Sequence, residues 1–392
     1  SGQGYLFHHF PLLISPKHNF QDTLLITQNS LLTTSPNISP PRSFVMSVPS
    51  FPRPLVLSRY RSIVPSCHRS YLHHKNVYVR VGGDLPINAH YGFHHYAMWG
   101  GASPEYGDLP DSWDTYKKIF LARKGDMGNA PIKEVINSLG NHLGSRNFGL
   151  DYQGDDFSVN LYWQTIFEDN SGKVWRKIED GLWGLVYKNH TKQKPLLESA
   201  VYEFLHTTDQ SGEHHRIDGE IVGGNDNYFN HTIYNSGWAY HSYIIGTPLI
   251  TSPIIDQLPS GQILINNKVV AHHLGVKGWL TENIHYKALV NYSMNYGING
   301  RAFQPVKREY SFLGTFQYRL PKQPSWIIKG KLCADLGKMY GENVGVFVSL
   351  VKGGEFLRER FKTTRNKKQE TYLSNNLLSF IFSFFISLWF RD

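Results

Sequence analysis

Cysteine is scarce in this sequence of 392 residues, which contains only Cys67 and Cys333. Two cysteines cannot build the framework of several disulfides that stabilises small secreted proteins, and no spacing typical of a zinc site is present. We therefore predict no disulfide framework, no metal site and no cofactor.

Catalytic motifs are also missing from residues 72–356. No G-x-S-x-G elbow, H-E-x-x-H pair or phosphate-binding P-loop occurs there. The paired carboxylates Asp155–Asp156 and Glu179–Asp180 lie beside predicted turns, and nothing places two acids across a cleft as glycoside hydrolysis requires. We predict that the protein is not an enzyme and has no catalytic residue.

Acidic residues are nearly absent from the first part of the chain. Residues 1–71 contain Asp22 as their only acid, together with nine of the 20 prolines and two of the 35 glycines. Residues 357–392 are basic at first and then apolar, and the apolar run from Leu377 to Phe390 has 14 residues, fewer than the ~17 to 25 of a membrane-spanning helix. Three explanations of these two ends remain open: disordered arms, membrane-associated segments, or sequence that is not native protein.

The net charge of +9 comes from the two ends, because residues 72–356 contain 27 basic and 27 acidic residues. A nucleic-acid-binding domain would concentrate positive charge on its folded part. We therefore predict no nucleic-acid partner.

Residues 72–356 are rich in segments of about ten residues in which apolar and polar side chains alternate. Phe157, Leu161 and Trp163 fall on one face of such a segment, and Asn160 and Gln164 fall on the other. A period of two indicates a β-strand with one apolar and one polar side. The pattern recurs at 284–296, 310–320 and 344–350 and gives roughly twelve strands. The length of these strands matches a tilted bilayer crossing. One short helix is predicted within residues 131–139.

Several segments resemble the capsule assembly protein family typified by Wzi. They are RKIEDGLWGLVY from Arg176, GGNDNYFNHTIYNSGWAYHSYIIGTPLI from Gly223, INNKVVAHHLGVKG from Ile265, and NVGVFVSLVKGGEF ending at Phe356. The resemblance implies a monomeric, all-β, antiparallel transmembrane β-barrel of the outer-membrane type, located in the bacterial outer membrane. It also implies a capsular or extracellular polysaccharide as the partner, besides outer-membrane lipid.

The domain organisation that follows has three parts. Residues 1–71 form a Pro/Ser-rich arm, residues 72–356 form the barrel, and residues 357–392 form a basic and then hydrophobic tail. Because the arm does not resemble the first strands of the family, we predict an N-terminally incomplete barrel. An open edge in lipid leaves backbone groups unpaired at a cost of several kcal/mol each.

The segment after Gly223 predicts a polysaccharide-binding site. It interleaves hydrogen-bonding side chains with aromatic rings, which is the combination that binds sugars, although the same residue types form loops and aromatic girdles. The candidate residues are Asn225, Asp226, Asn227, Tyr228, Asn230, His231 and Trp238.

Three histidine pairs, at 94–95, 214–215 and 272–273, suggest metal binding at first sight. Neighbouring residues of a strand point to opposite faces, so such a pair cannot chelate one ion without a bulge. We expect separate histidines at these positions.

The predicted function is non-catalytic binding or anchoring of polysaccharide at the cell surface. One alternative is an outer-membrane pore for small solutes, lined by the polar faces with Lys287, Arg319, Lys329 and Lys331. The other alternative is a soluble β-rich lectin or glycosidase.

Overall fold

The computed structural model describes residues 45–46, 69–353 and 384–390, apart from 104, 129, 137, 169–178, 192, 214, 218–219, 236, 241–242 and 253–263. All of these belong to one compact unit, Asn37–Asp392. Most of the predicted arm (1–71) and tail (357–392) lies outside the described residues, so the explanations offered for these two ends stay untested.

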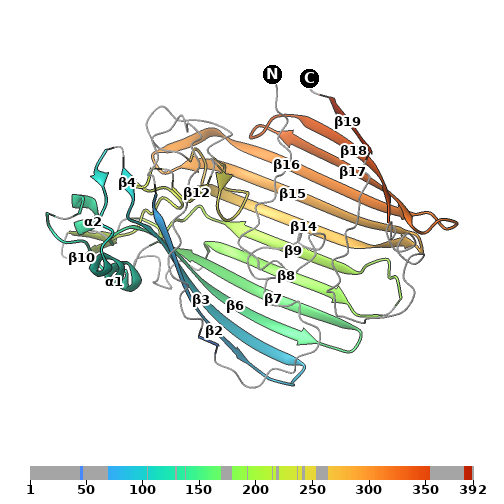
Figure 1. The fold of residues 1–392 in the computed structure, drawn as a ribbon, viewed down its shortest axis with the longest axis horizontal. Coiled ribbons are helices and arrows are strands. Elements are labelled where there is room, and N and C mark those ends of the chain that lie inside the picture. Colours follow the sequence, from blue (N-terminus) through green and yellow to red (C-terminus); the bar gives the residue numbers. More distant parts are fainter. Residues whose placement is uncertain are drawn as a thin grey trace, which may run out of the picture. The chain divides into compact units, whose positions relative to one another are not determined.

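One antiparallel sheet dominates the described part of the chain (Figure 1). The prediction of an all-β, antiparallel fold is confirmed. Eleven strands of this sheet lie between residues 71 and 352, close to the number expected. In spatial order the strands are β1 (Val45–Met46), β2 (Tyr71–Val81), β3 (Ile87–Trp99), β6 (Asn141–Gln153), β7 (Phe157–Phe167), β8 (Gly181–Asn189), β9 (Ser199–His206), β14 (Lys268–Thr281), β15 (Ile284–Ile298), β16 (Arg301–Arg319), β17 (Trp326–Gly337), β18 (Asn343–Lys352) and β19 (Phe384–Phe390).

The connections differ in length at the two ends of the strands. At one end they are short, such as residues 82–86, 154–156 and 282–283. At the other end two connections are long, residues 100–140 between β3 and β6 and residues 207–267 between β9 and β14. We call the described residues of these two connections the loop layer. Antiparallel strands place successive connections at alternate ends, which explains why both long segments lie at the same end.

The loop layer contains the remaining elements. Three small antiparallel pairs are β4 (Ala102–Ser103) with β5 (Gly107–Asp108), β10 (His215–Ile217) with β11 (Glu220–Gly223), and β12 (Ala239–Tyr240) with β13 (Tyr243–Ile244). Helix α2 (Ile132–Ile136) confirms the short helix predicted within 131–139.

Helix α1 (Trp113–Leu121) was not predicted. It begins at Ser112, whose hydroxyl accepts a hydrogen bond from the Thr115 backbone N–H, and Asp114 adds a negative charge to its first turn. It ends at Ala122, which adopts the left-handed conformation. The capping residues Ser112 and Asp114 can be recognised in the sequence. Only two residues of the helix, Thr115 and Ile119, are buried.

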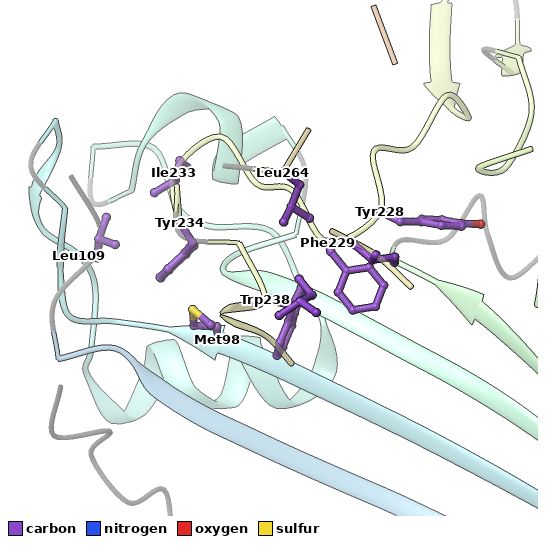
Figure 2. Packing of buried hydrophobic residues seen from close by; sticks show 10 residues of the cluster. Met98, Leu109, Tyr228, Phe229, Ile233, Tyr234, Trp238 and Leu264 are labelled. Atoms are coloured by element: carbon purple, nitrogen blue, oxygen red, sulfur yellow. The ribbon is translucent and has the colours of Figure 1, made fainter. Parts of the chain in front are cut away.

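The largest hydrophobic core of the described residues belongs to the loop layer and not to the middle of the sheet. Met98 at the end of β3 packs there with residues of both long connections (Figure 2). The other members are Leu109, Tyr228, Phe229, Ile233, Tyr234, Trp238, Ile244, Ile250 and Leu264.

Candidate functional site

The main sheet exposes its apolar side chains and buries many of its polar ones. In β7, Leu161 is 49% exposed, whereas the adjacent Tyr162, which hydrogen-bonds through its hydroxyl, is only 4% exposed. We call the side of the sheet that carries Leu161 the apolar face and the side that carries Tyr162 the polar face. A one-sided sheet of a water-soluble protein packs its apolar side on the core and turns its polar side to solvent. The burial in this sheet is therefore inverted.

A continuous row of apolar residues crosses the exposed face. Its members are directly opposed on nine neighbouring strands, and all except Ala334 are exposed. They are Leu150, Leu161, Leu185, Tyr202, Leu274, Val290, Phe312, Ala334 and Val344. An apolar surface of this extent on a folded protein indicates a partner that is itself apolar.

A second row of the apolar face consists of aromatic rings. It lies two residues from the first row along each strand, on the side of the loop layer. The Trp163 and Trp183 rings are 4.9 Å apart, and those of Tyr292 and Tyr310 are 4.7 Å apart. The full row is Tyr91, Phe148, Trp163, Trp183, Phe204, His272, Tyr292 and Tyr310. Trp and Tyr are enriched where a membrane meets water.

The polar face is held together by hydrogen bonds between side chains. The Tyr162 ring lies over Gly184, where a Cβ atom would come within 2.0 Å of it, and its hydroxyl donates to Glu203 on the next strand. Asp151 accepts a hydrogen bond from Asn160 and lies 3.2 Å from His90 Nδ1. These hydrogen bonds satisfy the Tyr162 hydroxyl and the carboxylates of Glu203 and Asp151 within the sheet.

The four cationic residues predicted to line a pore all lie on the polar face. In the strand register Lys331 faces Thr315, which also faces Lys287, while Lys329 faces Gln317 and Arg319 faces Ile327. Cys333 shares this face, has a free thiol and donates through Sγ to the Gly345 carbonyl at 3.4 Å. The structure thus brings these residues of β15, β16 and β17 to one side of the sheet.

Two of the predicted polysaccharide-binding residues are buried in the loop layer. Tyr228 is 1% exposed and Trp238 is 2% exposed, and both belong to the hydrophobic core of Figure 2. Burial raises the pKa of the Tyr228 phenol well above its usual value. These two rings stabilise the loop layer, and contact with a sugar would require them to move.

The polar residues of the predicted set form hydrogen bonds that stabilise the same loop segment. Asn267 Nδ2 donates to Asn227 Oδ1 at 2.6 Å and to the Tyr228 carbonyl at 2.7 Å. Asn230 donates to Asn227 Oδ1 at 3.1 Å. Asp226 accepts a hydrogen bond from Ser211.

Asn225 is the one exposed member of the predicted set of seven. Its φ is 53°, a left-handed value that asparagine tolerates better than most residues. The carbohydrate-binding assignment of the whole set stays a prediction.

His231 has a defined role in the backbone of the loop layer. Its Nδ1 accepts hydrogen bonds from the backbone N–H groups of Ile233 at 3.2 Å and Tyr234 at 3.1 Å. Burial lowers its pKa to about 3, and His142 and Lys133 contribute smaller electrostatic effects. The imidazole is therefore neutral near pH 7, with its proton on Nε2.

Asp180, one of the paired carboxylates noted in the sequence, fixes the start of the second long connection. It accepts hydrogen bonds from the backbone N–H groups of Asp209 at 3.0 Å and Gln210 at 2.6 Å. It also lies 2.9 Å from His206 Nδ1, and the other ring nitrogen of His206 is 3.0 Å from the Thr208 hydroxyl. The sequence alone did not reveal these contacts of Asp180 because the partners are 26 to 30 residues apart in the chain.

A shallow cavity of about 370 Å³ adjoins His206. Glu179, Trp183, Phe204 and His206 line it. Trp183 and Phe204 belong to the aromatic row, so the cavity lies on the apolar face at the end nearer the loop layer.

The described residues contain no group of three or more His, Cys, Asp or Glu side chains placed to hold a metal ion. The two histidines of the pair at 94–95 have different neighbours. His94 lies near His74, and His95 lies 2.9 Å from His142. Within the described chain, no helix has the length and apolar character needed to cross a bilayer.

Comparisons with models of protein families, with curated proteins and with solved structures found no match. The family resemblance therefore stays a prediction from the sequence segments that carry it.

Proposed function

We propose that this chain is an outer-membrane protein whose main sheet meets lipid with its apolar face, as part of a transmembrane β-barrel. The observation that carries the proposal is the inverted burial of the sheet. Lipid-facing apolar residues and inward-facing polar residues alternate along the strands of such barrels, with aromatic residues at the membrane interface.

The size of the exposed apolar row supports lipid over water as its surroundings. Transfer of one fully exposed Leu-sized side chain from water is worth about 1.5–3 kcal/mol. Eight large side chains of the row, each exposed by about a third to a half, thus correspond to roughly 5–10 kcal/mol by the same scale. That is comparable to the whole stability of an ordinary domain, about 5–15 kcal/mol.

The strand dimensions agree with a bilayer crossing. On β16 the residues of the apolar face run from Tyr310 to Tyr318, a distance of about 26 Å at ~3.3 Å per residue. A tilt of ~40° reduces this to a height of about 20 Å, near the ~25 Å apolar band of outer-membrane barrels.

Fluorescent labels on adjacent residues test the lipid contact. Leu332 is on the apolar face and Cys333 is on the polar face. The full chain with Cys67→Ser is labelled at native Cys333, and a second protein with Cys67→Ser and Cys333→Ser is labelled at Leu332→Cys. After reconstitution into vesicles, spin-labelled acyl chains should quench the label at 332 several-fold more than the label at 333. Equal quenching at both positions, or recovery of the folded chain without detergent, would contradict the proposal and favour the soluble lectin or glycosidase.

We propose further that the protein is non-catalytic and anchors capsular or extracellular polysaccharide at the cell surface. The resemblance to the capsule assembly family supports this, together with the Asn- and Asp-rich segment in which Asn225 is exposed. Deletion from the source bacterium should release capsule into the medium. Capsule retained on the surface of a clean deletion strain would contradict it.

A pore is the second candidate, because Lys287, Arg319, Lys329 and Lys331 share the polar face. A pore lined by these cations should conduct anions in preference to cations. Planar bilayers that contain the purified chain and show no conductance would exclude this function.

A further inference from the structure

Two carboxylates lie close together on the polar face, at the end of the sheet nearer the loop layer. Glu309 of β16 faces Gly337 of β17, and Asp335 lies two residues before Gly337 on the same face. Such diagonal positions on neighbouring strands are about 7–8 Å apart, and Asp335 repels Glu309 electrostatically. The two acids therefore form one cluster, which we call the carboxylate pair.

Glu309 is completely buried, yet only one of its two carboxylate oxygens is bonded. Oε2 accepts hydrogen bonds from the backbone N–H groups of Met339 at 2.9 Å and Tyr340 at 3.3 Å, so the side chain reaches the connection between β17 and β18. Glu309 is 0% exposed, and its Oε1 has no hydrogen-bond partner among the described residues. A buried oxygen in this state costs free energy unless another group binds it.

Two further oxygens of the polar face are in the same state. Ser311 lies between Asn291 and Asp335 in the strand register, and its hydroxyl donates to the Asp335 carboxylate. Asp335 Oδ1 and Asn291 Oδ1 are both shielded from solvent and have no partner in the described part of the chain. Three acceptor oxygens without a donor thus lie in one region of three neighbouring strands.

The positive charges of the described residues do not balance the carboxylate pair. Neither acid forms an ion pair with a described lysine, arginine or histidine. Lys307, two residues from Glu309 on the same face of β16, places its Nζ over the Phe303 ring at 4.3 Å. Lys331 lies four residues from Asp335 along β17, which is about 13 Å. Buried carboxylates are normally paired or coordinate a metal ion, so this region favours a bound cation.

We propose that the carboxylate pair, together with Asn291 and Ser311, binds one Ca²⁺ ion. All of these side chains offer oxygen atoms, which Ca²⁺ prefers, whereas zinc and copper prefer nitrogen or sulfur. Ca²⁺ accepts ~6–8 oxygen ligands, water included, in a flexible geometry, while Mg²⁺ requires a nearly ideal octahedron. An irregular set of oxygens fixed by three strands therefore suits Ca²⁺ better.

The spacing of the strands is compatible with one shared ion. Asn291 and Asp335 are two strand spacings apart, about 10 Å. Two Ca–O distances account for about 5 Å of that separation, and the reach of the two side chains from their Cβ atoms covers the rest. Glu309 approaches the same region from the side of the loop layer.

The site goes beyond the proposed function and does not depend on it. The sequence predicts no metal site because ligands on three different strands share no local spacing, and only the register brings them together. A bound ion would join β15, β16 and β17. Through the contacts of Glu309 it would also stabilise the connection between β17 and β18.

Equilibrium dialysis against radioactive Ca²⁺ tests the proposal. The full chain in detergent micelles is first stripped with EGTA and should then bind one Ca²⁺ per chain. The double variant Glu309→Gln, Asp335→Asn keeps the size of both side chains and should bind this ion about 10-fold more weakly or worse, since affinity follows the number of charged ligands. The matched control Asp155→Asn, Asp156→Asn removes two exposed carboxylates at the opposite end of the sheet and should bind as the original protein does.

Several results would overturn the proposal. Unchanged binding in the double variant, or equal losses in both double variants, would show that Ca²⁺ binds elsewhere or only adventitiously. No binding by the original protein would show that no cation site is present. Tighter binding of Mg²⁺ than of Ca²⁺ would reject the assignment of calcium.

The single variant Asp335→Asn separates ligand binding from a purely structural role. It removes one of two repelling charges and keeps an acceptor for the Ser311 hydroxyl, so in EGTA it should resist denaturant at least as well as the original protein. Added Ca²⁺ should raise the denaturation midpoint of the original protein but not of this variant, because only a bound ligand stabilises the folded state. A loss of stability that is the same with and without Ca²⁺ would contradict the proposal.

Asn291→Arg tests the third ligand. The guanidinium would lie near the carboxylate pair and take the place of the cation, so this variant should lose Ca²⁺ binding without a loss of stability in EGTA. Full Ca²⁺ binding in the variant would exclude Asn291 and, with it, the proposed site.

Discussion

At the scale of the residue, the surroundings of Leu332 decide between lipid and water. Its side chain is 45% exposed on the apolar face, opposite Gly314 and Val346. In lipid, Leu332→Arg should lower the free energy of unfolding by about 2–4 kcal/mol, because a cation near the middle of the bilayer is poorly solvated. Guanidinium titration of the chain in vesicles measures this.

The matched control is Asn291→Arg, which introduces the same cation on the polar face. We expect a change of less than about 1 kcal/mol, since polar surroundings solvate the guanidinium. If both substitutions instead stay within ~0.5 kcal/mol, as ordinary surface changes do, the apolar face contacts water.

His231 gives the loop layer a dependence on pH. Its pKa of about 3 in the folded protein is below the ordinary value of 6.5, so the unfolded state binds the proton more readily. The stability from its two accepted backbone hydrogen bonds is therefore fully present above pH 6.5 and declines as the pH falls toward 3.

Hydrogen exchange at Ile233 and Tyr234, corrected for intrinsic rates, should show lower protection at pH 4.5 than at pH 7. His231→Asn keeps an acceptor for the same N–H groups but does not titrate in this range. The difference between the two pH values should disappear in that variant, and a difference that persists would assign the effect to another group.

At the scale of the element, the contact between Tyr162 and Gly184 joins β7, β8 and β9. A Cβ at Gly184 would lie 2.0 Å from the Tyr162 ring, so Gly184→Ala must displace the ring and weaken its hydrogen bond to Glu203. We expect a destabilisation of about 1–3 kcal/mol. Gly314→Ala is the control, because the added Cβ would lie 3.0 Å from its nearest neighbour, the Cζ atom of Phe312, and denaturant unfolding should separate the two variants. Equal effects would show that the ring moves freely.

Individual strands could be predicted from sequence, but the loop layer could not. The alternation of Phe157, Leu161 and Trp163 with Asn160 and Gln164 sets one face against the other, and the structure confirms these faces. Trp238 was predicted from the sequence as a sugar-binding residue, yet its side chain is buried. Its neighbours in the core come from residues far apart in sequence, which no local pattern reveals.

At the scale of the whole molecule, the boundaries of the sheet matter most. The described strand order runs from β1 to β19, and backbone groups left unpaired in lipid cost several kcal/mol each. We predict that the full chain in a membrane has these edges paired. Unboiled samples on a denaturing gel should run faster than boiled ones, as closed barrels do. Identical migration would show that the edges do not close under these conditions.

The sequence by itself determined the antiparallel all-β class, the alternation of faces and the short helix near 132–136, because each depends on residues close together in the chain. The tertiary structure decided which face is exposed, which strands are neighbours and how they are aligned. The two rows of the apolar face depend on that alignment, since a shift of one residue in the register moves every side chain to the other face. They emerge only when strands distant in sequence lie side by side.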